Sequence, residues 1–239
     1  MSVAVLSDVH GNAFALDAVL ADVRAATPDL TVNLGDTVWG GADPGRAWAL
    51  QQEHAPPTVR GNTDELVAGR WPERDREQTA WVQAQLPAGV PEVLGALPTT
   101  AQVADGEVLL AHGHPQDPWR ALLFEGAPES PRLRPGPALL AELSGGSAVR
   151  VVLVGHTHRE ALVAEGGVTF VNVGAVSRQF QGDPAARWAL LERHQGLWNV
   201  QFRRVPYDIE GAARWAEAHA PQGAHEAAWL RQGRLPQSP

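Results

Sequence analysis

The feature that most constrains this fold is a short polar motif that recurs, in changing form, directly after apolar runs. Its first case is Asp8-Val9-His10, which follows the apolar residues 3–6. Four later cases also stand behind apolar runs, and they contain Asp36, Asn62, His112 with His114, and His156 with His158. Carboxylate, amide and imidazole groups are common oxygen and nitrogen ligands of metal ions. Because parallel strands bring such groups together at their carboxyl ends, the repetition favours one shared metal site.

The first part of the chain alternates between strand-like and helix-like patterns. Residues 13–26 carry apolar side chains at helical spacing behind Asn12, a residue type that commonly caps helices. This helix stands between the apolar runs at 3–6 and 30–34, and a strand, helix, strand order predicts a parallel pair joined by a right-handed crossover. Beyond it we expect a helix over 44–53, a short strand over 58–60 and mostly helical structure over 63–97.

Two segments in the middle of the chain are expected to deliver histidines. Residues 99–111 predict a hairpin whose second strand leads to His112. An apolar run over 149–154 predicts a strand that leads to His156. Between them, residues 115–137 are rich in proline and lack periodicity, which indicates a surface excursion beside the site, of the kind that often carries substrate selectivity.

Antiparallel signals follow towards the C-terminus. Apolar and polar residues alternate over 162–173 and again over 187–205. These patterns predict that a second sheet of mixed or antiparallel strands packs on the first. Helices are expected near residues 138–143, 209–219 and 224–232.

Composition narrows the chemistry of the site. The 239 residues include no cysteine, which excludes disulfides, thiolate metal sites and cysteine nucleophiles. A formal net charge of -8 argues against bulk nucleic-acid binding, which needs clustered basic residues, but it allows a small phosphorylated substrate beside bound dications. No targeting segment and no run of about 18 apolar residues is present, so we expect a cytoplasmic protein without a membrane span. The oligomeric state is not indicated.

Taken in order, the five motifs resemble the conserved blocks of the calcineurin-like metallophosphoesterase superfamily. The matching stretches are Asp8-Val9-His10, Gly35-Asp36, Gly61-Asn62-Thr63-Asp64, His112 and Gly155-His156-Thr157-His158. Later segments at 172–175, 182–184 and 205–208 resemble the C-terminal half of the small prokaryotic, phosphodiesterase-like branch. The resemblance implies an α/β fold, a sandwich of two mixed β-sheets flanked by α-helices. Because the motifs spread from residue 8 to residue 158, we expect a single domain over 1–239.

The resemblance also implies a site for two divalent metal ions, most simply Mn²⁺, with Fe, Ni, Zn or Mg as alternatives. The first ion would be held by Asp8, His10, Asp36 and His158, and the second by Asp36, Asn62, His112 and His156. Asp36 would then bridge the two ions. Such a pair can activate a bridging water for in-line attack on phosphorus, so no nucleophilic side chain is required.

Two departures from the family pattern bear on the substrate. Trp39-Gly40 stands where the Ser/Thr phosphatases carry an Asp-Arg pair, which argues against a protein phosphatase. Thr63 replaces a histidine that protonates the leaving group in many members, and a threonine hydroxyl cannot act as a general acid near neutral pH. Three explanations stay open: a good leaving group, another acid such as His114, or a metal-bound water.

We assign candidate catalytic roles to four residues, which are Asp36, Asn62, Arg60 and His114. Arg60 resembles the family's phosphate-facing arginine, although a surface ion pair is the alternative. Trp39 and Trp119 could stack on a base or an aryl leaving group, or form a hydrophobic rim.

Because Thr63 cannot act as a general acid, we rank a phosphodiesterase first. Its substrate would be a small phosphorylated molecule, which could be nucleotide-like. The runner-up is a phosphomonoesterase or dinucleoside polyphosphate hydrolase. A catalytically inactive scaffold with the same fold is the third alternative, and the retention of all seven ligand positions argues against it.

Overall fold

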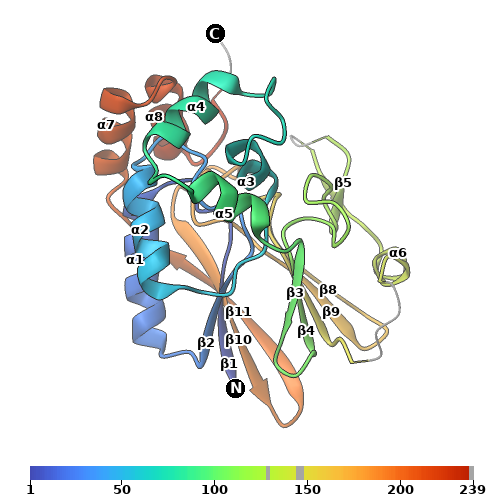
Figure 1. Ribbon diagram of the computed structural model, residues 1–239. Coiled ribbons are helices and arrows are strands. Elements are labelled where there is room, and N and C mark those ends of the chain that lie inside the picture. Colours follow the sequence, from blue (N-terminus) through green and yellow to red (C-terminus); the bar gives the residue numbers. More distant parts are fainter. Residues whose placement is uncertain (128–129, 144–147, 237–239) are drawn as a thin grey trace.

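The computed structural model describes residues 1–127, 130–143 and 148–236. It is an α/β fold in which two mixed β-sheets pack against each other and helices flank them (Figure 1). The first sheet has the order β11 (Leu197–Val205), β10 (Ala186–His194), β1 (Ser2–Leu6), β2 (Leu30–Asn33). The second has the order β3 (Thr100–Val103), β4 (Val108–Ala111), β7 (Val151–Val154), β9 (Val168–Val173), β8 (Glu160–Glu165).

The helices lie on the outer sides of the sheets and over their upper edge in Figure 1. Those that precede β3 are α1 (Ala13–Ala26), α2 (Pro44–His54), α3 (Asn62–Val67), α4 (Arg76–Ala84) and α5 (Val90–Ala96). The later ones are α6 (Gly136–Ala141), α7 (Ile209–His219) and α8 (Gly223–Gln232). The predicted bounds of the first helix are confirmed, and Asn12 caps it by accepting a hydrogen bond from Ala15 N at 3.0 Å.

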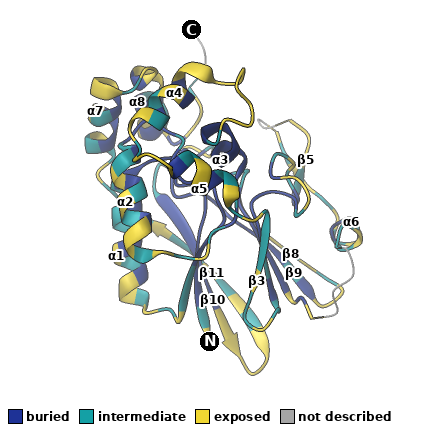
Figure 2. Ribbon diagram, in the orientation of Figure 1, coloured by how far each residue is buried: buried dark blue, intermediate teal, exposed yellow. Residues whose placement is uncertain are grey.

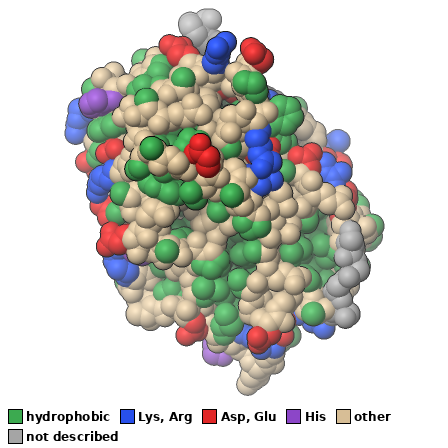
Figure 3. All heavy atoms as spheres, viewed as in Figure 1, with side chains coloured by type: hydrophobic (Ala, Val, Ile, Leu, Met, Phe, Trp, Pro, Cys, Tyr) green, Lys and Arg blue, Asp and Glu red, His purple; other side chains and the backbone are tan. Residues whose placement is uncertain are grey.

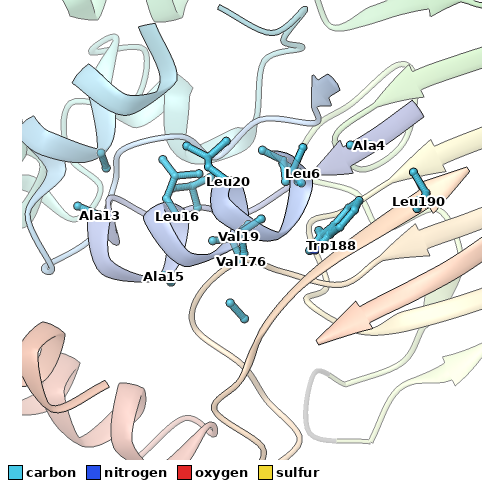
Figure 4. Packing of buried hydrophobic residues seen from close by; sticks show 14 residues of the cluster. Ala4, Leu6, Ala13, Ala15, Leu16, Val19, Leu20, Val176, Trp188 and Leu190 are labelled. Carbon is cyan, nitrogen blue, oxygen red and sulfur yellow. The ribbon is translucent and has the colours of Figure 1, made fainter. Parts of the chain in front are cut away.

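Strand β1 shows how the alternation of its side chains builds two cores. Val3 and Val5 point into the core between the sheets, which draws apolar side chains from both of them. Ala4 and Leu6 point the other way, into the layer between the first sheet and α1. There Leu6 meets apolar side chains of α1 and the fully buried Trp188 of β10 (Figure 4). Both faces of β1 are therefore buried, which anchors the motif that follows it.

The order of strands confirms part of the predicted topology and corrects part of it. Strands β1 and β2 are parallel, as their strand, helix, strand order predicted. The two C-terminal hairpins, however, do not form the second sheet together. Strand β10 pairs antiparallel with β1 in the first sheet, whereas β9 pairs parallel with β7 in the second. Local alternation predicts that a hairpin exists, but distant partners decide which sheet it joins.

The strand predicted over residues 58–60 is reduced to a single bridge between Asn33 and Thr58. Pro57 has no N–H to donate, and the backbone N–H of Arg60 turns away to the carbonyl of Pro98 at 2.7 Å. The segment still runs beside β2, so it brings Asn62 towards Asp36.

The proline-rich segment 115–137 is not the simple surface excursion that the sequence predicts. Leu122 and Leu123 are buried against the outer face of the second sheet, in a cluster with Phe170. The segment also forms a short hairpin, β5 (Phe124–Glu125) with β6 (Arg132–Leu133), at the right of Figure 1. Residues 128 and 129 of this prediction lie outside the described part of the chain.

Burial is highest where the sheets face each other and where α1 covers β1, whereas the tip of the β10–β11 hairpin is exposed (Figure 2). On the face seen in Figure 3, the basic side chains stand in small groups between acidic ones, with no continuous basic patch. Among the described residues, no helix is long and apolar enough to cross a membrane.

Candidate metal centre

The ends of four strands carry most of the predicted ligands to one edge of the two sheets. Asp8 and His10 follow β1, Asp36 follows β2, His112 follows β4, and His156 and His158 follow β7. Backbone hydrogen bonds tie neighbouring loops together, from Asp8 N to Gly35 O at 3.0 Å and from His10 N to Asp36 O at 2.9 Å. Asn62, the first residue of α3, completes the set. The two sheets thus contribute to one site.

The first group of ligand atoms gathers around His10. Its Nε2 atom lies 3.1 Å from Nε2 of His158 and 3.6 Å from Oδ2 of Asp36. Oδ1 of Asp8 lies 3.3 Å from Nε2 of His158. All four residues are buried. The structure therefore brings together the residues predicted to hold the first ion.

The second group gathers around Asn62, whose Oδ1 atom lies 2.9 Å from Nε2 of His112 and 2.9 Å from Nδ1 of His156. Nε2 of His112 lies 3.5 Å from Oδ1 of Asp36. The two oxygens of Asp36 therefore face different groups, as a bridging carboxylate requires. Oδ1 of Asp8 is also 3.9 Å from Nε2 of His112, so Asp8 stands between the two groups as well.

Backbone carbonyls select the ring nitrogen that each of three histidines turns inward. The Nδ1 atoms of His10, His112 and His158 lie 3.0, 2.8 and 2.6 Å from the carbonyl oxygens of Trp39, Leu34 and Arg178. A carbonyl only accepts, so each Nδ1 carries the proton and each Nε2 presents a lone pair to the centre. His156 is turned the other way, with Nδ1 towards Asn62 and a hydrogen bond to the backbone of Trp119.

The protonation of these side chains is set by burial and by their neighbours. Burial holds the pKa of His10 well below its usual value and lowers the pKa of His156 to about 3. Burial also raises the pKa of Asp36 to about 6, although His112 opposes this shift. For Asp8, burial would raise the pKa, but the charges of His158 and other histidines lower it overall. For His112, burial would lower the pKa, but the charges of Asp36 and Asp8 raise it overall. Metal ions bind the neutral form of an imidazole and the ionised form of a carboxylate, so metal binding would release any proton held here.

Two details show that the residues fit divalent cations. Oδ1 of Asp8 is buried and has no hydrogen-bond partner among the described residues, although three imidazole rings surround it. The inward lone pairs of His10 and His158 also face each other at 3.1 Å, which is unfavourable unless a cation lies between them. Nitrogen and oxygen donors of this kind suit Mn²⁺, Fe²⁺, Ni²⁺ or Zn²⁺.

The backbone at the ligands is strained. Five of the seven predicted ligands have left-handed φ angles between 49° and 66°, namely Asp8, His10, Asp36, His156 and His158. For a non-glycine residue such a conformation costs on the order of 1–3 kcal/mol, and it persists where surrounding structure enforces it, commonly at functional sites. The left-handed conformation turns the backbone sharply at the end of each strand, which directs these side chains towards the shared centre.

Two glycines allow the loops to approach. A Cβ atom at Gly61 would overlap Oδ1 and the backbone nitrogen of Asp36. A Cβ atom at Gly155 would overlap Oγ of Ser7 and Oδ2 of Asp8. Any larger residue at either position would push a ligand out of place.

Asp64 is a positioning residue that the sequence did not single out. Its buried carboxylate accepts hydrogen bonds from the backbone nitrogens of Asp36, Thr37 and Gly61 at 3.0, 3.0 and 2.8 Å. It also accepts a bond from the Thr37 hydroxyl at 2.7 Å. These bonds fasten the loop of Asp36 to the start of α3. The available sequence signal was an acidic residue at the third position of a helix, which is typical of a capping box.

Arg178 and Glu226 form a second support, which lies behind His158. Their buried side chains form an ion pair with bonds of 3.1 and 2.5 Å. The Arg178 guanidinium lies over the rings of Trp39 and Trp229, and its carbonyl receives the His158 bond. Helix α8 is thereby connected to the first group of ligands. No local pattern pointed to this pair, because its members are 48 residues apart.

The structure does not support the phosphate-binding role predicted for Arg60. Its guanidinium donates to Oε1 of Glu65 at 3.2 Å and to the carbonyls of Gly95 and Leu97 at 3.2 and 2.6 Å. These bonds join the start of α3 to the end of α5. The alternative of an ion pair is the one observed, although it is largely buried rather than on the surface.

The contacts of His114 also argue against the acid role that was considered for it. Its Nε2 atom lies 2.9 Å from Oε2 of Glu142, and its Nδ1 atom accepts a hydrogen bond from Gln116 N at 3.1 Å. Both ring nitrogens are thus engaged, one within the segment that follows β4 and one by Glu142, the C-cap residue of α6. The Thr63 hydroxyl is buried and has no hydrogen-bond partner within the described part of the chain, while the Thr63 backbone nitrogen donates to Oδ1 of Asp36 at 2.9 Å.

If these groups bind metal, adding Mn²⁺ to the metal-free protein is expected to stabilise it against unfolding. A site filled at a concentration 100 times its dissociation constant adds about 2.7 kcal/mol to the free energy of unfolding. The His112→Ala variant should lose the part of this stabilisation that comes from the second site. The control variant His194→Ala, at an exposed position, should be stabilised by Mn²⁺ as much as the unchanged protein. Calorimetric melts with and without Mn²⁺ measure these gains. Equal gains in all three proteins would exclude His112 as a ligand.

Comparisons with known proteins identify the family of the chain and the fold that it shares. A model described as the calcineurin-like phosphoesterase superfamily domain matches residues 1–196. The metallophosphoesterase structure from Sphaerobacter thermophilus superposes with a TM-score of 0.75 at 27% identity, covering 98% of this chain and 99% of that one. The structure of a hypothetical protein from Pyrococcus horikoshii OT3 superposes with a TM-score of 0.73 at 19% identity, covering 97% of this chain and 98% of that one. No curated protein sequence matches the chain.

A more distant structure, described as a novel archaeal phosphodiesterase, superposes with a TM-score of 0.50 at 14% identity. The match covers 85% of this chain and 100% of that one. At that identity it supports the fold alone. The family depends on divalent metals, and clustered candidate ligands are present here. Since the family model spans most of the sequence, the chain belongs to the calcineurin-like phosphoesterase superfamily.

Proposed function

We propose that the protein is a phosphodiesterase that uses two divalent metal ions, most simply Mn²⁺. The observation that carries this proposal is the convergence of seven oxygen and nitrogen donors into two adjoining groups, with Asp36 directing one oxygen at each. The whole chain, residues 1–239, is proposed to act as one domain, since both sheets and helix α8 support the centre.

The roles of the chain's own residues follow from their contacts. Asp8, His10, Asp36 and His158 would hold one cation, and Asp36, Asn62, His112 and His156 the other. When bound, the two cations supply Lewis acidity and an activated water for in-line attack on phosphorus. Asp64 keeps the Asp36 loop against α3, and the carbonyls behind three histidines keep their donor atoms aimed inward.

The ranking of diesters and activated esters above simple alkyl monoesters rests on the leaving group. The Thr63 hydroxyl is too weakly acidic to act as a general acid near neutral pH, and both nitrogens of His114 are engaged elsewhere. With neither candidate acid directed at the centre, a leaving group that needs little protonation reacts best. Aryl and other activated esters meet this condition, whereas simple alkyl monoesters do not.

Rates with an aryl phosphodiester and the matching aryl phosphomonoester, measured side by side with Mn²⁺, test the proposal. We expect the higher kcat/KM for the diester. A much higher value for the monoester would favour the runner-up, a phosphomonoesterase or dinucleoside polyphosphate hydrolase. Absence of activity with either, in protein shown by elemental analysis to hold two metal ions, would favour an inactive scaffold.

A further inference from the structure

A pocket of about 390 Å³ opens directly beside the second group of ligands. His156 and Thr157 line its inner side, so it is continuous with the candidate metal centre. Aromatic rings supply much of the remaining wall, from Trp119, Phe124 and Phe180. A volume of this size is typical of small-molecule sites.

The walls of the pocket are attached to the metal centre by specific contacts. The Phe180 ring packs edge-on against the ring of His158 with centroids 5.2 Å apart. The backbone of Trp119 forms a hydrogen bond with His156. The indole Nε1 of Trp119 also donates to Oε2 of Glu65, in α3, at 2.9 Å. A molecule in the pocket would therefore meet rings that are already held in place around the ligands.

Phe124 completes the wall from β5, a strand of the segment that follows β4. Its position depends on the short hairpin, where it stands opposite Leu133 of β6. The side chain is only partly buried, which leaves part of it facing the pocket. A basic group, Arg159, also lines the pocket and lies over the Phe180 ring at 5.9 Å.

We propose that this pocket binds a planar aromatic group of the substrate, a nucleobase or an aryl ring, while the phosphoryl group lies at the metal centre. Flat rings stack on aromatic side chains, and alanine substitution of one such side chain typically weakens binding by about 5- to 100-fold. The inference rests on the proposed phosphoesterase function for the phosphoryl end of the substrate. Of the two charged residues that line the pocket, Arg159 suits a substrate that carries negative charge nearby, whereas Glu125 adds an opposing charge.

Binding of phosphorus-free probes to the Mn²⁺-loaded protein tests the pocket separately from hydrolysis. We expect adenosine or 4-nitrophenol to bind saturably by calorimetry, and ribose not to bind. Saturable binding of adenosine alone would assign nucleobases, and that of 4-nitrophenol alone would assign aryl groups. Ribose binding as tight as both aromatic probes, or no binding of either aromatic probe, would overturn the proposal.

Variants of the hairpin sharpen this test. Phe124→Leu keeps much of the side-chain volume but removes the flat ring, so it should weaken aromatic binding by about 5- to 100-fold. Leu133→Ala, at the facing and half-exposed position, is the matched control and should bind as the unchanged protein does. Equal affinity of the Phe124→Leu variant would contradict the assignment. If aromatic probes bind but no phosphoester is cleaved, the proposed function fails and the pocket assignment stands.

Discussion

Asp36→Asn is expected to abolish phosphoester hydrolysis while leaving the protein folded. The substitution keeps the shape of a side chain that is only 2% exposed, but it removes the charge that faces both ligand groups. Loss of a single electrostatic donor in an active site commonly lowers kcat by about 10²- to 10³-fold, and a ligand shared by two ions should matter more. We therefore expect a loss of at least about 10³-fold in kcat/KM and less than two metal ions per chain by elemental analysis.

The stability of the Asp36→Asn variant separates this result from simple misfolding. Burial raises the pKa of Asp36 to about 6, so the metal-free folded state binds its proton more tightly than the unfolded state does. Ionisation therefore costs the folded state stability as pH rises from the usual value of 3.8 through 6, and the cost is fully present at pH 7–8. Without metal, the variant should melt no lower than the unchanged protein at pH 8.

A matched control is Asp17→Asn, which changes an exposed carboxylate of α1 paired with Arg46. It should keep full activity and both metal ions. An Asp36→Asn variant with activity near that of the Asp17→Asn control would refute the role of Asp36.

A large loss of stability is expected from Glu226→Ala, a substitution in helix α8. The substitution leaves the Arg178 guanidinium buried, 7% exposed, without its carboxylate partner. Removing one member of a buried ion pair typically costs about 3–5 kcal/mol, because the remaining charge stays desolvated. Denaturant titration measures this loss, and the change should lie in the midpoint rather than in the slope.

Two further variants isolate the cause. Replacing both members, Arg178→Met with Glu226→Leu, should recover much of the lost stability because no lone charge remains buried. Glu210→Ala breaks an exposed pair with Arg231 on the neighbouring helix and should change stability little. If Glu226→Ala were as mild as Glu210→Ala, the buried pair would not stabilise the fold.

The same pair should influence metal binding, because the Arg178 carbonyl accepts a hydrogen bond from Nδ1–H of His158. Changes behind a metal ligand typically cost about 10- to 100-fold in metal affinity. Glu226 lies beyond residues 1–196, where the family model matches. Helix α8 would thus contribute to a candidate metal centre whose predicted ligands all precede residue 159.

The candidate site residues differ in how well the sequence predicts their position, because some depend on contacts that local motifs do not show. Six of the seven candidate metal ligands closely follow strands, so their motifs predicted both their chemistry and their common location, whereas Asn62 begins α3 after a single bridge. Arg60 and His114 stand beside such motifs in the sequence, but the direction of a side chain is decided by its partners. Those partners are Glu65 with two carbonyls for Arg60, and Glu142 for His114. Adjacency in the chain could not predict either contact.

Apolar periodicity and strand-end motifs are local signals, so the sequence by itself predicted the early helices and strands and a shared site at the strand ends, whereas the sandwich fold class and the candidate ligand set were implied by the resemblance to the family. The helix that follows Asp8-Val9-His10 and the parallel pairing of β1 with β2 were predictable in the same way. Only the tertiary structure decided which sheet each late hairpin joins, how Asp64 and the Arg178–Glu226 pair support the ligands, and where Trp119, Phe124 and Phe180 form a pocket. These features depend on pairing and burial between residues far apart in sequence, where no local pattern distinguishes one partner from another.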